Sequence, residues 1–229
     1  MAQTADDPFT RLSAIIPLGP GDRADELASV LQHHPRINEV IVSAAEAPPP
    51  GDPVGDHWIH GTTGRGVQLN RGAAAATGSW IWFVHADSRL SAETIAAVAG
   101  FASDATAVIG YCRLRFSSDG PWLANLNAFG ANLRSRIFRQ PYGDQGLCMP
   151  MAVFQQLKGF REDLDRGEDL DFVVRANMSG IPIRSMGATI TTSARRYREQ
   201  GWMRTTWQHQ LAAARLIRKA RRAGYPDNP

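Results

Sequence analysis

Short apolar blocks separated by helical segments run through the first half of this 229-residue chain. Leu12–Leu18, Glu39–Ser43 and Ser79–Val84 predict buried strands, because strands covered on both faces lose the alternation of apolar and polar residues. His57–His60 predicts a short strand between the last two. The order strand, helix, strand is typical of a right-handed parallel crossover. We therefore expect a single α/β domain with a mostly parallel central sheet flanked by helices.

Helix signals separate these strands. Asp22 is expected to cap the first helix, and a second, Ala-rich helix should begin after Gly64 and end before Gly78. In the second half, Ser91–Ala102 predicts a helix capped by Ser91, and Ala107–Arg115 predicts a strand. Pro121–Arg139 predicts a helical segment of mixed composition. Gly167–Phe172 predicts the start of a further helix, and Ile181–Thr191 predicts a final strand.

The segment Ala44–Asp56 is rich in proline and has no periodicity, so it predicts a loop or polyproline II. Two interpretations stay open: a surface excursion and a loop that faces substrate.

Composition adds that the chain is a water-soluble protein. No apolar run approaches the roughly 18 residues that span a bilayer, and residues 1–10 lack the basic start and apolar segment of a signal peptide. Cys112 and Cys148 lie in apolar contexts, which favours two buried thiols in a reducing compartment. We expect a cytoplasmic protein, with a tail at residues 1–10 and one domain over residues 11–200.

Positive charge is concentrated near the C-terminus. The formal net charge is +3, but Arg195–Arg222 carries +8 and the remainder −5. This asymmetry suits an acidic partner such as a nucleotide phosphate or an anionic lipid; nucleic acid is not expected, since no recognisable binding module is present.

Residues 201–229 predict an amphipathic helix and tail. Its apolar stripe is typical of packing on the same domain, and a second interpretation is peripheral contact with the inner face of a membrane. The stripe comprises Met203, Trp207, Leu211, Ala214 and Ile217.

One acid stands where chemistry is expected. Asp87 follows the buried strand Ser79–Val84, and ligands of open α/β sheets bind at the carboxyl ends of strands. Arg65 and Gln68 share a face in the first turn of the Ala-rich helix, where backbone N–H groups and the helix dipole favour an anion. An exposed, solvated pair at these two positions is the competing interpretation.

These motifs together resemble the glycosyltransferases of family 2, which have the GT-A nucleotide-sugar fold. The resemblance is to a small soluble bacterial branch whose metal motif is His-Ala-Asp, and it extends through most of the chain. It rests on the SAIIP strand, Gly64–Leu90, YGDQG at Tyr142–Gly146, GEDLDF at Gly167–Phe172 and TSARRY at Thr192–Tyr197.

The resemblance implies a role for individual residues on the donor side. Asp87 matches the acid that holds Mn²⁺ or Mg²⁺ against the donor diphosphate, which suits a hard cation. Donor-contacting positions are matched by Pro17, Arg65 and Asn70, with Gln68 beside them. Arg195 and Arg196 correspond to residues near the donor phosphates, and the late His209 is a candidate third metal ligand, although helical spacing alone gives it no such role.

Two positions depart from the family pattern. His85 replaces the usual first acid of the metal motif, and its imidazole suits contact with the ribose or with Mn²⁺. The acid that reads the nucleobase after the second strand is missing, and Glu46 stands slightly further on. The nucleotide is therefore open, with UDP as the default.

The remaining motifs imply the acceptor side and the catalytic group. Asp169 corresponds to the base of inverting members, whereas acids in a first helical turn otherwise complement the helix dipole. Asp144, Gln145 and Glu168 are candidates for contact with acceptor hydroxyls. The arginines and aromatics of Pro121–Arg139 suit either an acceptor site or the two faces of an ordinary surface helix.

We therefore expect an inverting, metal-dependent glycosyltransferase that moves a sugar from a nucleoside-diphosphate sugar to an unknown acceptor hydroxyl. A non-catalytic sugar-nucleotide binder is an alternative, because the motif is altered at His85 and Ala44. A sugar nucleotidyltransferase is disfavoured, since no Gly-rich loop with a following Lys occurs near the N-terminus.

Overall fold

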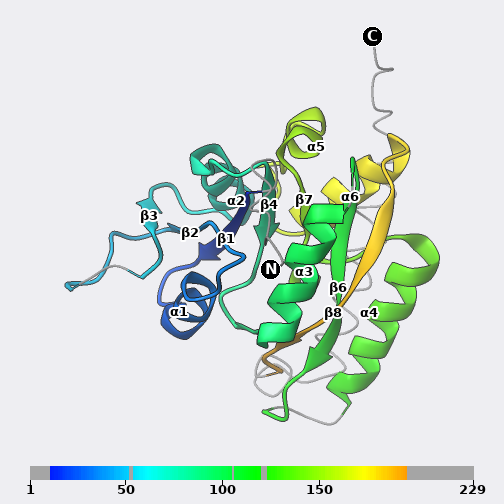
Figure 1. Ribbon diagram of the computed structural model, residues 1–229, viewed down its shortest axis with the longest axis horizontal. Coiled ribbons are helices and arrows are strands. Elements are labelled where there is room, and N and C mark those ends of the chain that lie inside the picture. Colours follow the sequence, from blue (N-terminus) through cyan, green and yellow to red (C-terminus); the bar gives the residue numbers. More distant parts are fainter. Residues whose placement is uncertain (1–10, 52–53, 105, 120–122, 195–229) are drawn as a thin grey trace, which may run out of the picture.

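The computed structural model describes residues 11–51, 54–104, 106–119 and 123–194. Its eight strands form one sheet in the order β3-β2-β1-β4-β7-β6-β8-β5 (Figure 1). The strands are β1 (Leu12–Leu18), β2 (Glu39–Ala44), β3 (His57–His60), β4 (Trp80–Phe83), β5 (Ser88–Arg89), β6 (Ile109–Phe116), β7 (Cys148–Pro150) and β8 (Ile183–Thr192).

The N-terminal half of the sheet is parallel, as the order strand, helix, strand predicts. β1 pairs in parallel with β2 on one side and with β4 on the other, and β2 pairs in parallel with β3. The C-terminal half is mixed: β7 is antiparallel to both β4 and β6, and β5 is antiparallel to β8, whereas β6 and β8 are parallel. The carboxyl ends of β1, β2 and β4 consequently meet at one edge, where a ligand site is expected.

Helices cover both faces of this sheet, which confirms the predicted α/β architecture. One apolar cluster joins the sheet to α1, α3 and α4, and a second joins its other face to α2, α5 and α6. The helices are α1 (Asp25–Gln32), α2 (Arg65–Ala75), α3 (Ala92–Asp104), α4 (Ala124–Phe138), α5 (Met151–Gln156) and α6 (Glu168–Met178), with a 3₁₀ turn, η1, at Gly143–Gln145.

Helix α2 packs closely on β1 because it carries a glycine at the contact. A Cβ on Gly72 would lie 2.4 Å from Cγ2 of Ile15. This close approach fixes the height of α2 above the sheet, and with it the position of Arg65 at the start of the helix.

Some local expectations need correction. Asp22 does not cap α1: the helix begins at Asp25, and Oδ2 of Asp22 instead accepts the backbone N–H of Gly19 at 3.2 Å. The Ala-rich helix ends at Ala75, earlier than Gly78 suggested. Ser91 does cap α3, since its Oγ accepts the Thr94 N–H at 3.2 Å.

The remaining sequence expectations are mostly confirmed. The described part of residues 45–56 has no helix or strand, as the proline content predicts. Cys112 and Cys148 are buried free thiols, and burial raises the pKa of Cys112 to about 12. None of the helices in the described ranges is long and apolar enough to cross a bilayer.

Candidate active site

The end of β4 brings two of the predicted residues to the carboxyl edge. All four residues of β4 are buried, and the Val84 N–H still donates to the Ile15 carbonyl at 2.9 Å. His85 follows as a half-buried side chain, and Asp87 is exposed in the turn before β5. The polar side chains of His85 and Asp87 therefore follow directly after the point where the pairing of β4 with β1 ends.

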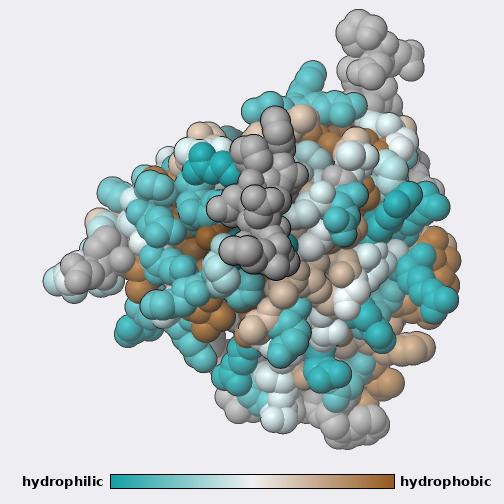
Figure 2. Space-filling model, in the orientation of Figure 1, coloured by the Kyte–Doolittle hydropathy of each residue, from teal (hydrophilic) through white to brown (hydrophobic). Residues whose placement is uncertain are grey.

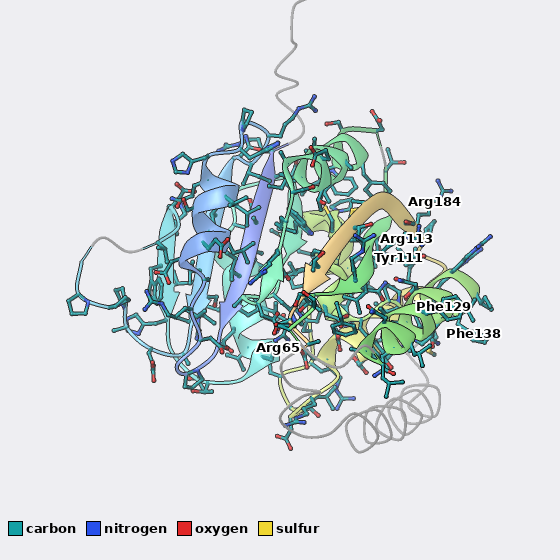
Figure 3. The ribbon with its side chains drawn as sticks, turned by 90° about the horizontal axis from the view of Figure 1, so that it is seen from below. Arg65, Tyr111, Arg113, Phe129, Phe138 and Arg184 are labelled. Atoms are coloured by element: carbon teal, nitrogen blue, oxygen red, sulfur yellow. The ribbon has the colours of Figure 1, made fainter. Side chains whose placement is uncertain are left out.

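Arg65 contacts both Glu168 in α6 and His85 after β4. Its Nε lies 2.9 Å from Oε1 of Glu168 in α6, and its guanidinium also donates to Nε2 of His85. Because arginine has no acceptor, Nε2 of His85 must be the acceptor in this contact. Arg65 is near the middle of the molecule in Figure 3 and is about a third exposed, so it remains accessible to a ligand.

Helix α6 begins with a left-handed glycine that points its first acids at this place. Gly167 has φ 84°, and Glu168, Asp169 and Asp171 lie in the first turn. Asp169 is half-buried; its Oδ2 accepts the N–H of Gly143 at 2.5 Å and its Oδ1 accepts the N–H of Leu170 at 2.8 Å. Each of its oxygens keeps a further lone pair for a ligand proton.

Gly143 lies between Asp169 and His85. A Cβ at this position would lie 3.0 Å from Oδ2 of Asp169 and 3.0 Å from Nε2 of His85. The absence of a side chain here lets the backbone of η1 sit between these two groups.

Asp144 is a second acid of unusual character beside Asp169. Its Oδ1 is inaccessible to solvent and has no hydrogen-bond partner among the described residues. Burial, reinforced by the charges of Asp169 and Asp87 and opposed by Arg134, raises the pKa of Asp144 to about 7. A carboxyl group that is neutral part of the time near neutral pH can both donate and accept a hydrogen bond.

Glu168 shares this acidic environment. It is 2% exposed, and its burial together with the neighbouring charge of Asp169 raises its pKa, while Arg65 acts in the opposite direction. The cluster therefore concentrates negative charge, which, among the described residues, Arg65 and the half-buried Arg134 offset. Arg134 packs over the ring of Tyr142, 3.4 Å from its centroid, and its Nη2 has no partner among the described residues.

Three of the predicted contact residues serve the fold in this structure. Gln68 is buried, and its amide nitrogen donates to the carbonyls of Leu18 at 2.5 Å and of Ser43 at 3.2 Å, so it joins the ends of β1 and β2. Gln145 is 0% exposed, with its oxygen and nitrogen both bonded within the core. The expectation that Gln145 meets an acceptor needs correction, because no part of the side chain reaches the surface.

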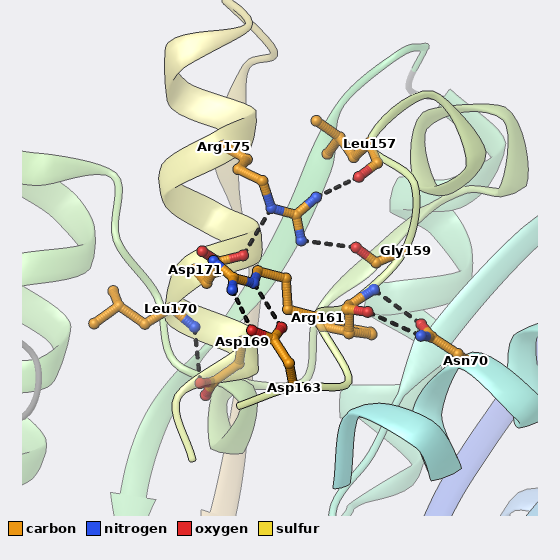
Figure 4. A network of polar contacts seen from close by, with 10 residues as sticks. Asn70, Leu157, Gly159, Arg161, Asp163, Asp169, Leu170, Asp171 and Arg175 are labelled. Atoms are coloured by element: carbon orange, nitrogen blue, oxygen red, sulfur yellow. Dashed lines mark hydrogen bonds and ion pairs between the residues drawn. The ribbon is translucent and has the colours of Figure 1, made fainter. Parts of the chain in front are cut away.

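Asn70 holds a loop rather than facing the open edge. Its amide exchanges two hydrogen bonds with the backbone of Phe160, at 2.8 and 2.9 Å (Figure 4). On the other side of the same loop, buried Arg175 pairs with Asp171 at 2.7 Å and donates to the carbonyls of Leu157 and Gly159. The loop is thereby fixed between α2 and α6, and Asp171 is committed to this network.

The other predicted donor residues lie at the expected edge. Pro17 is buried in β1 opposite Ser43, and Glu46 is exposed just after β2, where its carbonyl accepts from the Trp58 indole at 3.2 Å. Arg195, Arg196 and His209 lie outside the described residues.

Arg71 is a residue that the sequence analysis did not identify. Its guanidinium donates to the Ala44 carbonyl at 2.6 Å, to Oγ of Ser43 at 3.3 Å and to the Thr62 carbonyl at 3.3 Å. It thus lies against the carboxyl end of β2. Its spacing of three from Gln68 could have revealed it, since residues three apart share a helix face.

Metal ligands are sparse in this arrangement. Within the described residues no group of three or more His, Cys, Asp or Glu side chains is arranged to hold an ion. Asp87, with the unpartnered oxygen of Asp144 in its electrostatic neighbourhood, nevertheless fits the way that Mg²⁺ or Mn²⁺ is bound with a nucleotide, by one or two carboxylates plus substrate phosphates. The residues present therefore suit an ion that arrives with its substrate.

Comparison with known proteins shows the family to which the chain belongs. The sequence profile described as "Glycosyltransferase like family 2" matches residues 39–222, most of the chain. The chain therefore belongs to this glycosyltransferase family. No curated protein is significantly similar to it in sequence.

Solved structures support the same fold. The mannosyltransferase PcManGT from Pyrobaculum calidifontis, in complex with GDP-Man and Mn²⁺, has a TM-score of 0.60 at 18% identity, covering 80% of this chain and 56% of its own. TarS from S. aureus has a TM-score of 0.58 at 16% identity, covering 80% of this chain and 37% of its own. A TarS 1-349 structure with UDP-GlcNAc has a TM-score of 0.57 at 16% identity, covering 80% of this chain and 58% of its own. The chain thus spans well under two thirds of each, and shares their GT-A fold.

Proposed function

We propose that this chain is an inverting glycosyltransferase that uses a nucleoside-diphosphate sugar and a divalent metal ion. The observation that carries the proposal is the cluster of Arg65, His85 and Asp169 around Gly143. This cluster brings an arginine that can bind phosphate close to a candidate catalytic base at the carboxyl edge of the sheet. Family membership supports the reaction class.

The donor would lie along the ends of β1, β2 and β4. Arg65 would bind the diphosphate through charge-assisted hydrogen bonds from the side of its guanidinium that Glu168 leaves open. The base and ribose would lie towards Pro17, Glu46 and Arg71. UDP remains the default nucleotide, and the structural neighbours with UDP-GlcNAc and with GDP-Man make both nucleotides worth testing.

Asp87 would hold the metal ion together with the donor phosphates, and Asp144 lies close enough to contribute charge. When bound, such an ion supplies Lewis-acid neutralisation of the diphosphate leaving group. His85 is proposed to orient Arg65, since Nε2 already accepts from the guanidinium. His209, Arg195 and Arg196 remain candidates for the metal and the phosphates.

Asp169 would take the proton of the acceptor hydroxyl while that oxygen attacks the anomeric carbon opposite the leaving diphosphate. The backbone N–H of Gly143 and of Leu170 fix both carboxylate oxygens, so the base is held before substrate binds. One bond to the anomeric carbon forms as the other breaks, which inverts its configuration.

Asp144 and Arg134 are proposed to face the acceptor. Each has a buried polar atom without a partner among the described residues, an acceptor on Asp144 and a donor on Arg134. An alcohol oxygen both donates and accepts a hydrogen bond, so acceptor hydroxyls match this pair chemically.

We place the reaction in the cytoplasm, since the two cysteines of the described structure are unpaired and buried.

The test is Asp169→Asn in the full chain, with the exposed Asp165→Asn as the matched control. The variant should bind the donor as the wild type does, within about threefold, and should lose transfer by about 10²–10⁴-fold. Binding is measured by calorimetry with UDP- and GDP-sugars and Mn²⁺ or Mg²⁺, and transfer by release of nucleoside diphosphate.

Other outcomes distinguish the alternatives. Normal transfer by Asp169→Asn would refute the base assignment. Donor binding by the wild type without turnover or hydrolysis, over a panel of acceptors, would favour a sugar-nucleotide binder. Pyrophosphate release from a nucleoside triphosphate and a sugar phosphate would favour a nucleotidyltransferase.

A further inference from the structure

Helix α4 carries an apolar stripe that nothing covers in the described structure. Seven large apolar side chains are exposed among the described residues, and five of them lie on this one helix. Their exposed fractions run from 44% to 67%, and the residues are Leu126, Phe129, Leu133, Ile137 and Phe138. Large exposed apolar patches on soluble proteins mark interaction surfaces.

The spacing of the first four of these residues shows that they form one face of the helix, the α4 stripe, whereas Phe138 is the last residue of α4. Leu126, Phe129, Leu133 and Ile137 are separated by three, four and four residues, so they line up along the axis. The opposite face of α4 is small and buried on the sheet, through Ala124, Ala128, Ala131 and Ser135. Figure 3 shows Phe129 and Phe138 on the outer side of α4, and Figure 2 shows apolar surface at the edge of the molecule that α4 occupies in Figure 1.

The chain itself supplies a matching stripe. Residues 203–217, outside the described ranges, have apolar side chains at helical spacing, from Met203 through Trp207 and Leu211 to Ile217. As a helix this stripe would be roughly 21 Å long, and the α4 stripe from Leu126 to Ile137 is roughly 16 Å long. Two stripes of similar length with large and small residues suit packing of ridges into grooves.

The chain also leaves the described structure in a suitable place. Asp119 holds the end of β8: its Oδ2 accepts from Oγ of Ser193 at 2.6 Å and its Oδ1 accepts the Ala194 N–H at 2.8 Å. Helix α4 begins at Ala124, shortly after Asp119. The residues between Ala194 and Met203 can span up to about 30 Å, which is ample to place the start of the second stripe on α4.

We propose that residues 203–217 form a helix that docks along the α4 stripe. Tethering favours this occupant over a second copy of the chain, because a short linker gives an intramolecular partner an effective concentration in the millimolar range. As a helix at 100° per residue, Arg204, Arg215 and Arg222 would project roughly 80–100° from the middle of the stripe, where long side chains can reach water, and Arg218 would follow the last residue of the stripe. On α4, Arg134 turns inward over Tyr142 and donates to the Gln140 carbonyl at 2.9 Å.

The experiment is hydrogen exchange on the full chain, followed by mass spectrometry. In the wild type the amides of residues 203–217 should be protected. In Phe129→Asp that protection should fall by about tenfold or more, because a charge replaces a large apolar contact. Asn125→Asp, at an exposed position on α4 to the side of the stripe, is the control and should leave the protection unchanged.

A second measurement guards against general unfolding. Peptides from β1 and α2 should exchange equally in all variants. Phe129→Ala and Trp207→Ala should lower the Tm by less in combination than the sum of the single effects, because either change removes the same contact. Additive effects would overturn the proposal, as would unprotected amides at residues 203–217 in the wild type.

Two other occupants appear as distinct outcomes. A dimer in light scattering that Phe129→Asp dissociates would assign the stripe to a second copy. Flotation with phosphatidylglycerol vesicles that Phe129→Asp abolishes would assign it to an anionic membrane. Either result overturns the docking of residues 203–217 on α4.

Discussion

The Nε of Arg65 lies 2.9 Å from Oε1 of Glu168, and this ion pair joins the start of α2 to the start of α6. Glu168 is almost fully buried and Arg65 is about a third exposed. The guanidinium therefore has one side fixed by a buried acid and one side open to a ligand. An arginine held in this way is pre-organised to receive a second anion.

Arg65→Ala should weaken donor binding by about tenfold or more, because a charge-assisted hydrogen bond to phosphate is worth about 1.5–3 kcal/mol. Arg65→Lys should recover part of the loss, since lysine keeps the charge but not the fork geometry. Calorimetry with the sugar nucleotide that the wild type binds best checks this. The control is Arg184→Ala, which changes an exposed arginine at the start of β8. Equal losses of donor affinity in the two alanine variants would contradict a specific role for Arg65.

Glu168→Gln should change how stability depends on pH. Burial and Asp169 raise the pKa of Glu168 towards about 7, so between pH 4.5 and 7 the folded state binds more protons than the unfolded state. The wild type should therefore lose stability as the pH rises through this range. Relative to the wild type, Glu168→Gln should become more stable as the pH rises from 5 to 8.

Thermal unfolding at a series of pH values measures this difference. Asp144→Asn should show the same sign, because the pKa of Asp144 is also raised to about 7 by burial and by Asp169. A difference between Glu168→Gln and wild type that stays constant with pH would show that Glu168 has an ordinary pKa in the folded protein.

Gly143→Ala should impair transfer while leaving the donor site intact. The new methyl would lie 3.0 Å from both Asp169 Oδ2 and His85 Nε2, so at least one of the two groups must move by a few tenths of an ångström. Small displacements of a reacting group cost up to about 10²-fold in rate. We expect kcat to fall by about ten- to a hundredfold, with donor affinity within about threefold of wild type.

The control is Gly100→Ala in α3, where a Cβ would meet nothing within 4 Å. This change should stabilise the protein slightly, by about 0.5–1 kcal/mol, because alanine is the better helix former. Steady-state kinetics on the two variants separates a steric effect in the active site from a general effect of the substitution. An unchanged kcat in Gly143→Ala would show that the neighbours of Gly143 adapt without cost.

The strands and helices were predictable because their burial is written in the sequence. β1, β2 and β4 are buried at every position, and a continuous apolar run reports that directly. β5, a strand of two residues, and α5, a short helix directly after Pro150, have too few residues for any periodicity to appear. The antiparallel direction of β7 was not predicted either, since an apolar run carries no information about strand direction.

The site was predictable in its residue types but less so in their tasks. The motifs that contain Arg65, Asp87 and Asp169 carried the resemblance to the family. Gln68 and Gln145 have the same polar chemistry as ligand-binding residues, and only the structure shows that their amides bond to the fold. The raised pKa of Asp144 is equally hidden, because it arises from burial in the fold and from the charges of Asp169 and Asp87, which are distant in sequence.

The last prediction concerns Asp119, which ties Ser193 and Ala194 to the end of β6. Partial burial works against its ionisation, but hydrogen bonds from Ser117, Ser193 and Ala194 outweigh it and lower the pKa to about 2. The carboxylate therefore contributes stability that is present above pH 4 and is lost as the pH falls towards 2. Asp119→Asn should lack this acid-dependent part and lose about 1 kcal/mol at neutral pH.

Acid unfolding followed by circular dichroism measures the pH dependence, and hydrogen exchange should show faster opening of residues 188–194 in the variant. Asp104→Asn, at the exposed end of α3, is the control and should change neither. Because Arg195 and Arg196 directly follow Ala194, loosening this end should also weaken donor binding if these arginines contact the phosphates. If Asp119→Asn lowers stability but leaves donor affinity unchanged, Asp119 stabilises the fold alone. The proposed role of Arg195 and Arg196 in phosphate binding would then be wrong.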